Sequence, residues 1–540
     1  MVEAPGMRVT DTRVTPVDRC DFCRYCRAYE GARLCVLNMD EDARGETTDG
    51  SEEPGFGTQE VPSDRGSGTR ESRRGSGTRE SQRPFDTKES AQGFDTRSVH
   101  AGATPDPETG ARATPIYQTT SYAFDSAENA AERYALERDE HVYSRISNPT
   151  VETLEERLAS LEGGAGAVAT ASGMAALDSL VLLLAKPGEN VVCSTDTYGG
   201  TTAYFSKTAS RRGIEIRFVP TLEYDAYADA IDEKTAFVHV ETIGNPSLVT
   251  PDFGRLAELA DENGVPLVVD NTFATPALCR PLEHGADVVW ESTTKWLHGS
   301  GTTVGGVVVD GGSFSWAEEG YEEVGGPNSA YPDVDFSQDF ADAPLAAALR
   351  YRALRSLGNG QSPFDAFQTL QGLESLPLRM AKHCENAVAV AEFLDDHEGV
   401  SWVTYPGLES HPTHENARRY LADFGGMIAF GLDGGYEAGR RFCESVELAS
   451  FLANVGDAKT LVIHPASTTH GQLTPDEREA AGVTEDLIRL SVGIEDPKDV
   501  IADLEAAIRE ATRAGDGAAD GRTGELESNE IGEFGTEVKP

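Results

Sequence analysis

Short apolar runs alternate with amphipathic stretches through the middle of the chain. Seven runs rich in Val, Ile and Ala have the length and composition of buried strands, and they lie at 167–170, 190–194, 215–219, 235–241, 266–269, 287–291 and 305–309. Amphipathic stretches such as 174–184 and 253–263 separate most of these runs and predict helices. Continuous apolar strands that alternate with helices are typical of α/β folds, so we expect a mainly parallel sheet covered on both faces.

The pattern changes after residues 310–342, which are rich in Gly, Pro and acidic side chains. Helical periodicity resumes at 344–356, 364–373 and 376–397. The strand-like runs SWVTYPG, GMIAFGL and TLVIHP follow, and a last helical stretch covers 497–512. This order predicts a smaller C-terminal α+β domain behind the large α/β domain.

The two ends of the chain differ in composition from its centre. The first part repeats GSGTRES, and like the Gly- and acid-rich C-terminal end it holds too few apolar residues to bury a core, which predicts disorder. A segment with turns, aromatic residues and little helical periodicity follows the repeats, and a helix begins at Thr150. We therefore predict a disordered extension at 1–92, an extended arm at 93–150, a large domain at 151–345, a C-terminal domain at 346–512 and a disordered acidic tail at 513–540.

The chain is strongly acidic, with a formal net charge of −45 and a pI of about 4.5. Such an excess argues against nucleic-acid binding through phosphate neutralisation. Its size favours adaptation to a salt-rich cytoplasm, where screening reduces self-repulsion, over an ordinary solvated surface. No apolar run reaches the roughly 20 residues that cross a bilayer, and the N-terminus lacks the apolar core of a signal peptide. We expect a cytoplasmic protein with no membrane or nucleic-acid partner.

The eight cysteines fall into two groups. Four are scattered in apolar surroundings and are predicted to be small buried residues in a reducing compartment: Cys193, Cys279, Cys384 and Cys443. Four near the start have a spacing that could hold zinc or an iron–sulfur cluster: Cys20, Cys23, Cys26 and Cys35. Because no His and no ordinary fold surround this second group, we favour an incidental extension, or a misassigned start codon, over a metal site.

Polar residues follow two neighbouring apolar runs at the point where each run ends. Asp270 follows the first, and Ser292, Thr294 and Lys295 follow the second. Because parallel strands present their carboxyl ends at one edge, these side chains should meet in one crevice. A desolvated lysine is nucleophilic, and a carboxylate can hold a protonated pyridine nitrogen, so the pair suits pyridoxal 5′-phosphate (PLP). The ordinary alternatives are a surface lysine and a turn or capping aspartate.

Ser172-Gly173-Met174 lies between a predicted strand and the helix at 174–184. Backbone N–H groups at a helix N-terminus bind phosphate, and glycine permits a close approach, although such turns are also common without a ligand. The glycine-rich run at 163–166 precedes its strand instead of following it, which argues against a dinucleotide-binding fold.

Two further residues have functional and structural interpretations. Tyr198 in TDTYGGT could stack on a cofactor ring and move protons, or it could simply pack in a turn. Arg489 interrupts an apolar strand-like run, so its charge needs a partner, either a substrate carboxylate or a structural acid. The histidines, including His239, His464 and His470, show no metal-ligand spacing and are interpreted as packing or hydrogen-bonding residues.

Together these residues resemble the Cys/Met-metabolism family of PLP-dependent enzymes, whose fold is type I, like that of aspartate aminotransferase. The resemblance runs from about residue 93 to about 512 and rests on the ordered motifs ATPIYQTTSY, YSRISNPT, ASGMAAL, TYGGT, ETIGNP, VDNTFATP, STTK, GDAKTLVIHPASTTH and RLSVGIED. It implies a large PLP-binding domain, a smaller C-terminal domain, and a dimer that usually pairs into a tetramer.

The resemblance also implies a role for each candidate residue. Lys295 would bind the cofactor covalently, Asp270 would pair with its pyridine nitrogen, and Tyr198 would stack on its ring. The phosphate would be held by Gly173, Met174, Ser292 and Thr294, and from a neighbouring subunit's arm by Tyr143 and Arg145. Asn245 would contact the phenolic oxygen, and Arg489, helped by the backbone around Asn454, would bind the substrate carboxylate.

Within the family, GARATPIYQTTSY, NPSLVTPDF and the insertion at 310–342 most resemble the O-acetylhomoserine sulfhydrylase branch. That branch implies reaction of O-acetyl-L-homoserine with sulfide to give L-homocysteine and acetate, or with methanethiol to give methionine. Cystathionine γ-synthase and γ-lyase share the catalytic residues and stay open as alternatives, although Gly200 stands where methionine γ-lyases tend to have Cys. A non-catalytic binding or regulatory module is a further alternative, which intact Lys295 and Asp270 disfavour.

Overall fold

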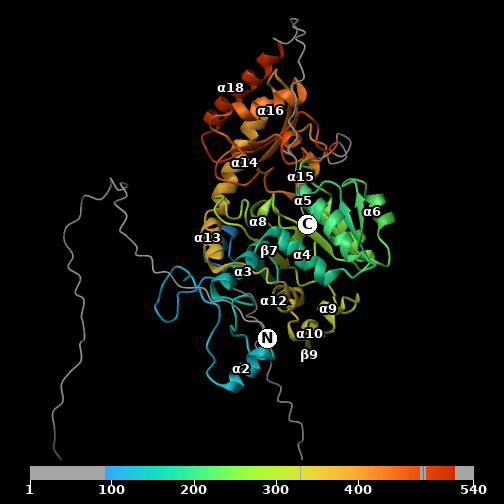
Figure 1. Cartoon of the computed structure of the whole chain (residues 1–540), viewed down its shortest axis with the longest axis vertical. Coiled ribbons are helices and arrows are strands. Elements are labelled where there is room, and N and C mark those ends of the chain that lie inside the picture. Colours follow the sequence, from blue (N-terminus) through green and yellow to red (C-terminus); the bar gives the residue numbers. More distant parts are fainter. Residues whose placement is uncertain (1–91, 329, 473, 475–477, 479–481, 517–540) are drawn as a thin grey trace, which may run out of the picture. The chain divides into compact units, whose positions relative to one another are not determined.

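The computed structural model describes residues 92–328, 330–472, 474, 478 and 482–516 (Figure 1). All of them belong to one compact unit, Ser76–Pro540. Residues 1–91, with Cys20, Cys23, Cys26 and Cys35, and residues 517–540 lie outside the described residues, and they make up nearly all of the predicted extension and acidic tail. Of residues 513–516, only the helical backbone is described.

A seven-stranded sheet forms the centre of the large domain, in the order β1-β7-β6-β5-β4-β2-β3. Its strands are β1 (Gly166–Thr170), β2 (Asn190–Ser194), β3 (Glu215–Val219), β4 (Thr235–Glu241), β5 (Leu267–Asp270), β6 (Val288–Glu291) and β7 (Gly306–Asp310). β7 runs antiparallel to both of its neighbours, and the other pairs are parallel. The mainly parallel α/β sheet predicted from the apolar runs is therefore confirmed.

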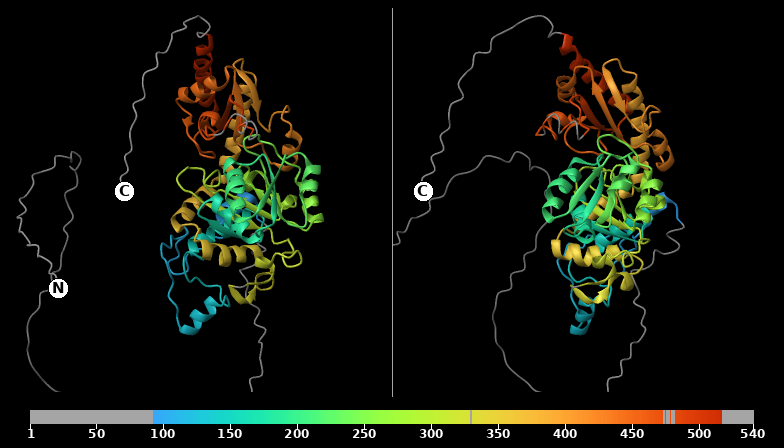
Figure 2. Two further views of the ribbon diagram at one scale, coloured as in Figure 1. Left: turned by 45° about the vertical axis from the view of Figure 1, so that its right-hand side comes forward. Right: turned by 90° about the vertical axis from the view of Figure 1, so that its right-hand side faces the viewer.

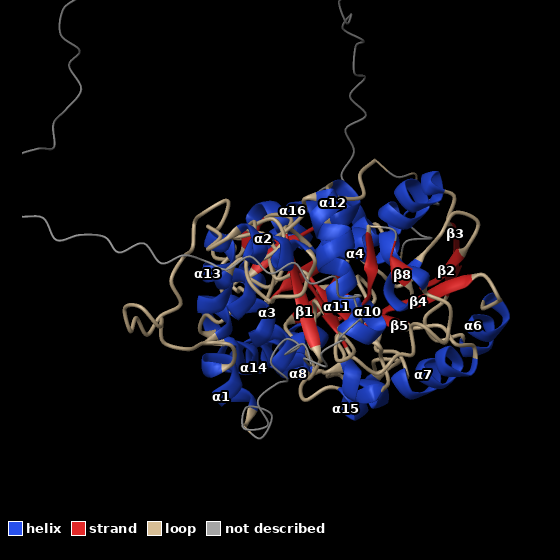
Figure 3. Ribbon diagram, turned by 90° about the horizontal axis from the view of Figure 1, so that it is seen from below, coloured by secondary structure: helices blue, strands red, loops and turns tan. Residues whose placement is uncertain are grey.

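Helices cover both faces of this sheet, as Figure 3 shows. Successive strand residues alternate between two cores: Val268 and Val288 face the cluster that contains α4, while Val269 and Val289 face the cluster that contains α3 and α7. Burial on both sides explains why each strand is a continuous apolar run. The helices of this domain are α3 (Pro149–Glu162), α4 (Gly173–Leu184), α5 (Gly199–Ala203), α6 (Tyr224–Ala230), α7 (Phe253–Glu262) and α8 (Thr275–Leu278), with shorter turns η1 (Tyr204–Ala209), η2 (Ser210–Arg212) and η3 (Pro281–His284).

The ends of α3 follow from local sequence. The Asn148 side chain accepts a hydrogen bond from the backbone N–H of Thr150, and Pro149 occupies the first turn, where its missing N–H costs nothing. Gly163 ends the helix in a left-handed conformation with φ 78°, which other residues adopt only with strain.

The arm contains more helix than its sequence predicts. α1 (Phe94–His100) packs against α3, and α2 (Ala127–Tyr134) begins at Ser126, whose side chain accepts from the N–H of Asn129. Both helices are only two turns long, so they show little periodicity in sequence. The expectation of an arm with little helix is wrong at these two places, and the Ser126 cap was the available signal.

The insertion after β7 folds into short elements: α9 (Glu322–Gly325), β8 (Pro327–Asn328), β9 (Tyr331–Asp335) and α10 (Phe336–Asp339). The predicted helix at 344–356 is α-helical in α11 (Pro344–Ala348) and α12 (Arg355–Leu357), with a π-helical stretch, η4 (Leu349–Leu354), between them.

The C-terminal elements, orange to red in Figure 2, build a second sheet of five strands in the order β10-β11-β14-β13-β12. These strands are β10 (Val400–Thr404), β11 (Met427–Leu432), β12 (Ser450–Phe451), β13 (Leu461–Ile463) and β14 (Leu487–Ser491), and all pairs but β12–β13 are antiparallel. A separate apolar cluster joins this sheet to its helices. The helices are α13 (Pro363–Leu373), α14 (Leu376–Asp395), α15 (His414–Tyr420), α16 (Gly435–Ser445) and α18 (Pro497–Asp516), with a short turn, η5 (Pro465–Ser467).

Candidate active site

Three neighbouring parallel strands end in carboxylates at one edge of the large sheet. Glu241 ends β4, Asp270 ends β5 and Glu291 ends β6. Glu241 pairs directly with Asp270 across the two strands, and Asp270 pairs with Trp290, the residue before Glu291. Burial raises the pKa of the Asp270 carboxyl to about 7, against the lowering effect of hydrogen bonds from Thr272. The carboxyl ends of these three strands therefore bring acidic side chains together at one edge of the sheet.

Lys295 lies just beyond this edge and contacts the C-terminal domain. Its ammonium donates to the side-chain oxygen of Asn454 at 2.5 Å. Burial, and second the positive charge of Arg489, lower the pKa of the Lys295 amine to about 8. A lower pKa leaves more of the amine uncharged and nucleophilic near neutral pH.

Arg489 lies in β14 and points its charge into the same region. Its guanidinium donates to the side-chain oxygen of Asn245 at 3.3 Å. Burial lowers the pKa of Arg489 to about 10, whereas the nearby Tyr198 raises it. Among the described residues no carboxylate forms an ion pair with this side chain, so the structural acid that sequence analysis left open is not found there. A half-buried guanidinium without such a partner suits an anionic ligand.

A close-packed cradle lies at the N-terminus of α4. Ser172 caps this helix through its side chain, which accepts from the N–H of Ala175 at 3.1 Å. A Cβ atom on Gly173 would lie 2.9 Å from the Cβ of Ser292, so only glycine allows the helix N-terminus and the residues after β6 to approach this closely. Backbone N–H groups and a hydroxyl thus converge where an anion can be held.

Two residues predicted to hold phosphate, Thr294 and Met174, direct their side chains to other groups of the protein. The Thr294 hydroxyl donates to the carbonyl of Gly305 at 3.2 Å and accepts from the N–H of Gly305 at 3.1 Å. The Met174 side chain packs against the apolar cluster under α4, which leaves its backbone for a ligand. A phosphate contact through the Thr294 hydroxyl would require this group to change partners.

The Tyr198 ring lies over Gly200. A Cβ atom on Gly200 would come within 2.3 Å of the ring carbon Cε1 of Tyr198. The ring is 49% exposed, and the backbone N–H of Tyr198 donates to Glu241 at 2.5 Å. The absence of a side chain at Gly200 therefore leaves room for the ring, and the hydrogen bond to Glu241 holds the backbone of Tyr198 at the end of β4.

Replacing Gly200 by alanine should displace the Tyr198 ring, because the added methyl group cannot share its space. We expect kcat/KM to fall roughly 10²-fold, as for a small misplacement of a reacting group. Steady-state kinetics would measure the fall, with Gly93→Ala as a control because a Cβ there meets no atom within 4 Å. Wild-type kinetics in the Gly200 variant would contradict the placement of Tyr198.

Tyr143 and Arg145 lie on the arm and contact none of the residues above within the described part of the chain. The Arg145 guanidinium lies 5.4 Å from the centre of the Tyr143 ring, in a cation–π arrangement. The Tyr143 ring is 42% exposed. The structure of one chain thus leaves this pair available to a second copy.

Two residues of the site were not found from sequence. Glu241 is the neighbour of Asp270 and binds the backbone of Tyr198; its signal was a charged residue at the end of an apolar strand. His470 had been interpreted only as a packing or hydrogen-bonding residue. A Cβ atom on Gly199 would lie 3.3 Å from its Nε2 atom, and burial, then the charge of Arg489, lower the pKa of the His470 ring.

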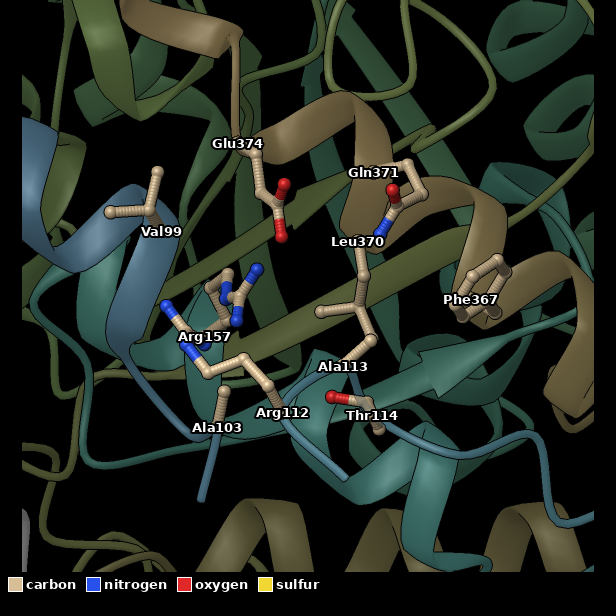
Figure 4. A pocket seen from close by; sticks show the side chains of 10 residues that line it. All are labelled: Val99, Ala103, Arg112, Ala113, Thr114, Arg157, Phe367, Leu370, Gln371 and Glu374. Atoms are coloured by element: carbon tan, nitrogen blue, oxygen red, sulfur yellow. The ribbon is translucent and has the colours of Figure 1, made fainter. Parts of the chain in front are cut away.

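A cavity elsewhere contains none of the predicted site residues. It lies between α1, α3, the arm and α13, and Figure 4 shows Arg112, Arg157 and Glu374 around it. Arg157 is buried and donates to the carbonyl of Ala101 at 3.0 Å.

In the described ranges we find no cluster of three His, Cys, Asp or Glu residues able to hold a metal ion. No helix there is long and apolar enough to span a bilayer.

Comparison with known proteins decides the family. The family described as Cys/Met metabolism PLP-dependent enzyme matches residues 95–509. The chain belongs to this family. A homocysteine synthase of Schizosaccharomyces pombe is 48% identical over 417 residues, covering 76% of this chain and 97% of that protein. An O-acetyl-L-homoserine sulfhydrylase of Thermus thermophilus is 46% identical over 413 residues, covering 76% of this chain and 98% of that protein.

A solved structure supports the same assignment. It is described as an O-acetylhomoserine (thiol)-lyase from Campylobacter jejuni, has a TM-score of 0.74 and 36% identity, and covers 77% of this chain and all of its own. That protein carries N′-pyridoxyl-lysine-5′-monophosphate. The fold is therefore that of the type I PLP-dependent enzymes, as the motifs implied, and the cofactor of this chain is PLP.

The residues of this chain fit that cofactor. The close approach of Ser292 to the N-terminus of α4, which a Cβ on Gly173 would prevent, suits a phosphate, and the amine of Lys295 has a pKa low enough for attack on an aldehyde. Asp270 offers a buried carboxyl that accepts from the Thr272 N–H at 2.9 Å.

Proposed function

We propose that the protein replaces the acetyl group of O-acetyl-L-homoserine with sulfide and releases L-homocysteine and acetate. Methanethiol in place of sulfide would give methionine. The observation that carries the proposal is the half-buried Arg489, which has no ion-pair partner among the described residues and whose charge lowers the pKa of Lys295. A guanidinium there can bind the α-carboxylate of an amino acid while the lysine acts on the Cα next to it. The names of the similar proteins above support this choice of substrates.

Each residue of the site then has a defined task. PLP, when bound, stores the electrons released from the substrate. Asp270 would hold a negative charge for the pyridine nitrogen, the phosphate would be held by Gly173, Met174, Ser292 and Thr294, and Asn245 would orient the phenolic oxygen. Lys295 would bind the cofactor covalently, and its amine would take the proton from Cα of the substrate. Asn454 aims the lysine by accepting from its ammonium.

Tyr198 is the candidate for a second acid or base. It lies close enough to Arg489 to affect the pKa of that guanidinium and is half exposed, so its hydroxyl could exchange protons during departure of acetate and addition of sulfide. Arg489 keeps the substrate carboxylate in place throughout these proton transfers.

Product analysis tests the proposed reaction. O-acetyl-homoserine and O-succinyl-homoserine are each offered with sulfide, and separately with cysteine, and cystathionine is offered alone. Homocysteine formed from the acetyl ester and sulfide is the expected result. Cystathionine formed from cysteine would instead assign a γ-synthase, and breakdown of cystathionine would assign a γ-lyase. No turnover of any of them, in protein that binds no PLP, would point to a non-catalytic role.

We also propose that the working enzyme is a homodimer or homotetramer. The support is the exposed Tyr143 ring with Arg145 beside it, a pair that can reach the phosphate of a neighbouring subunit. Light scattering coupled to gel filtration measures the assembly state. Mixing a Lys295→Ala chain with a Tyr143→Ala chain should restore one intact site per mixed dimer if the arm acts across subunits.

Finally, the acidic excess supports a cytoplasmic enzyme adapted to high salt. The formal net charge is −45, and its like charges repel one another over a screening length of about 30 Å in 0.01 M salt but only about 3 Å in 1 M salt. We expect the melting temperature to fall, and activity to be lost, on dialysis from concentrated KCl into dilute buffer. Differential scanning calorimetry across a KCl series would show this, and full stability in dilute buffer would refute it.

A further inference from the structure

The small cavity of Figure 4 has two arginines in its wall and contains none of the residues that the proposed reaction uses. Arg112 of the arm and Arg157 of α3 both line it, and its volume is about 30 Å³. About 10–15 Å³ is enough for one water molecule, whereas pockets for drug-sized ligands measure about 300–1,000 Å³. The cavity therefore has room for one or two water molecules or a single monatomic ion, and none for a nucleotide or an amino acid.

Arg157 is only partly hydrogen-bonded although its side chain is 2% exposed. Its Nε atom donates to the carbonyl of Ala101 at 3.0 Å, which fixes the direction of the side chain. Its Nη1 atom is buried and has no acceptor among the residues that the structure describes. A buried charged donor without an acceptor is costly, so this N–H group requires an acceptor inside the cavity.

The charged side chains of the cavity do not neutralise one another. Figure 4 shows the guanidinium groups of Arg112 and Arg157 next to each other, with Glu374 of α13 beyond them. In the described part of the chain none of the three takes part in an ion pair. Burial lowers the pKa of Arg157, the charge of Glu374 raises it, and the charge of Arg112 lowers it. Two positive charges and one negative charge leave the cavity with a net charge of +1.

The rest of the lining suits a small anion. Thr114 contributes a hydroxyl and Gln371 a side-chain amide, which are neutral donors. Val99, Phe367 and Leu370 supply apolar walls. Apolar walls lower the local dielectric constant, so the attraction between a guanidinium and an anion is stronger here than in water.

We propose that this cavity binds one small monovalent anion, with chloride as the probe, between Arg112 and Arg157. One negative charge balances the net charge of the cavity, whereas sulfate or phosphate is larger and would place excess negative charge beside Glu374. The anion is the acceptor that the Nη1 atom of Arg157 lacks within the protein. It fastens the arm to α3 and α13, three elements that lie far apart in the sequence.

Thermal melting of the holoenzyme at constant ionic strength tests the site. Chloride replaces glutamate stepwise while the potassium concentration stays fixed, so general screening of the acidic surface does not change. An ion that binds only the folded protein stabilises it by mass action, so the melting temperature should rise and then level off as the site fills. We expect a total rise of about 2–4 °C. A melting temperature that shows no saturation with chloride overturns the inference.

Two substitutions in the lining should act in opposite directions. Arg112→Gln removes a positive charge, so the chloride concentration at half-saturation should rise roughly tenfold. Glu374→Gln removes the negative charge and should lower that concentration by a similar factor, roughly tenfold. Both side chains are exposed at one end, so these variants should fold. Arg157 is left unchanged because its hydrogen bond to Ala101 also holds the arm.

The matched control is Arg418→Gln, which makes the same change of charge on α15. Arg418 pairs there with Glu415, and the two side chains are 61% and 84% exposed. This variant should keep the wild-type chloride curve. If it shifts the curve as Arg112→Gln does, or if Arg112→Gln and Glu374→Gln shift it in the same direction, the effect comes from net charge and the inference is overturned.

Bromide locates the site directly, because it replaces chloride and scatters anomalously. Holoenzyme crystals grown in potassium bromide should show an anomalous peak between the guanidinium groups of Arg112 and Arg157, and Arg112→Gln crystals should lack it. A peak that persists in Arg112→Gln crystals would be an adventitious ion only. A wild-type cavity filled with water alone would show that water is the missing acceptor. Either of these two results overturns the inference, and neither affects the proposed reaction.

Discussion

Replacing Lys295 by alanine should abolish turnover and leave PLP bound only noncovalently. The lysine supplies both the covalent attachment and the base, and loss of a positioned base alone costs about 10²–10⁴-fold in rate. The absorbance of the lysine-bound cofactor should disappear from the purified protein, and kcat should fall below detection in the homocysteine assay.

Two further variants make this result specific. Lys295→Arg keeps a positive charge near Asn454 but offers no nucleophilic amine, so it should be as inactive as the alanine variant. Lys382→Ala removes a lysine on the surface of α14 that pairs with Glu385, and it should leave activity unchanged. Turnover by Lys295→Ala would mean that another group carries the chemistry.

The pH dependence of reattachment tests the same lysine. Because burial and Arg489 lower the pKa of Lys295 to about 8, the uncharged amine becomes abundant well below the usual range for lysine. The rate of PLP attachment to cofactor-free protein should therefore rise with pH and level off above that value. Arg489→Leu removes the second of these causes, so the midpoint of the rise should move to higher pH.

Sequence alone predicts the strands of the large sheet well, because strands buried on both faces become uninterrupted apolar runs. The runs predicted at 190–194, 215–219 and 235–241 match β2, β3 and β4. Strand direction is not written in such runs: Val307, Val308 and Val309 resemble any buried strand, yet β7 is antiparallel. Direction depends on the connection that leads into the strand, and this connection carries no periodic signal.

Sequence predicts those candidate site residues that directly follow an apolar run. Asp270 and Lys295 stand out as polar residues directly after apolar runs, and the structure places both at one edge of the sheet. The contact from Lys295 to Asn454 joins residues 159 positions apart, so no local pattern could show it. Glu291 also ends an apolar run, whereas the buried Glu162 is the last residue of a helix, where sequence alone suggests an ordinary solvated acid.

The difference between Asp270 and its acidic neighbours leads to the second prediction. Replacing Asp270 by asparagine keeps the shape and the hydrogen bond from the Thr272 N–H but removes the negative charge. An amide cannot hold a protonated pyridine nitrogen, so the ring of the cofactor loses its capacity to accept electrons. Removing one member of a buried charge pair costs about 2–5 kcal/mol, which corresponds to a loss of roughly 30- to 5,000-fold in kcat/KM.

Asp287→Asn is the control for this substitution because its half-buried carboxyl lies directly before β6, at the opposite end of the strands. It should retain activity within a few-fold of the wild type. If both variants lose activity equally, the effect belongs to the stability of the sheet. If Asp270→Asn keeps full activity, the charge opposite the cofactor must come from Glu241, the only other carboxylate that pairs directly with Asp270 in the described strands. Glu241→Gln in the Asp270→Asn background would then be inactive. The activity of this double variant would therefore show which of the two carboxylates supplies the charge.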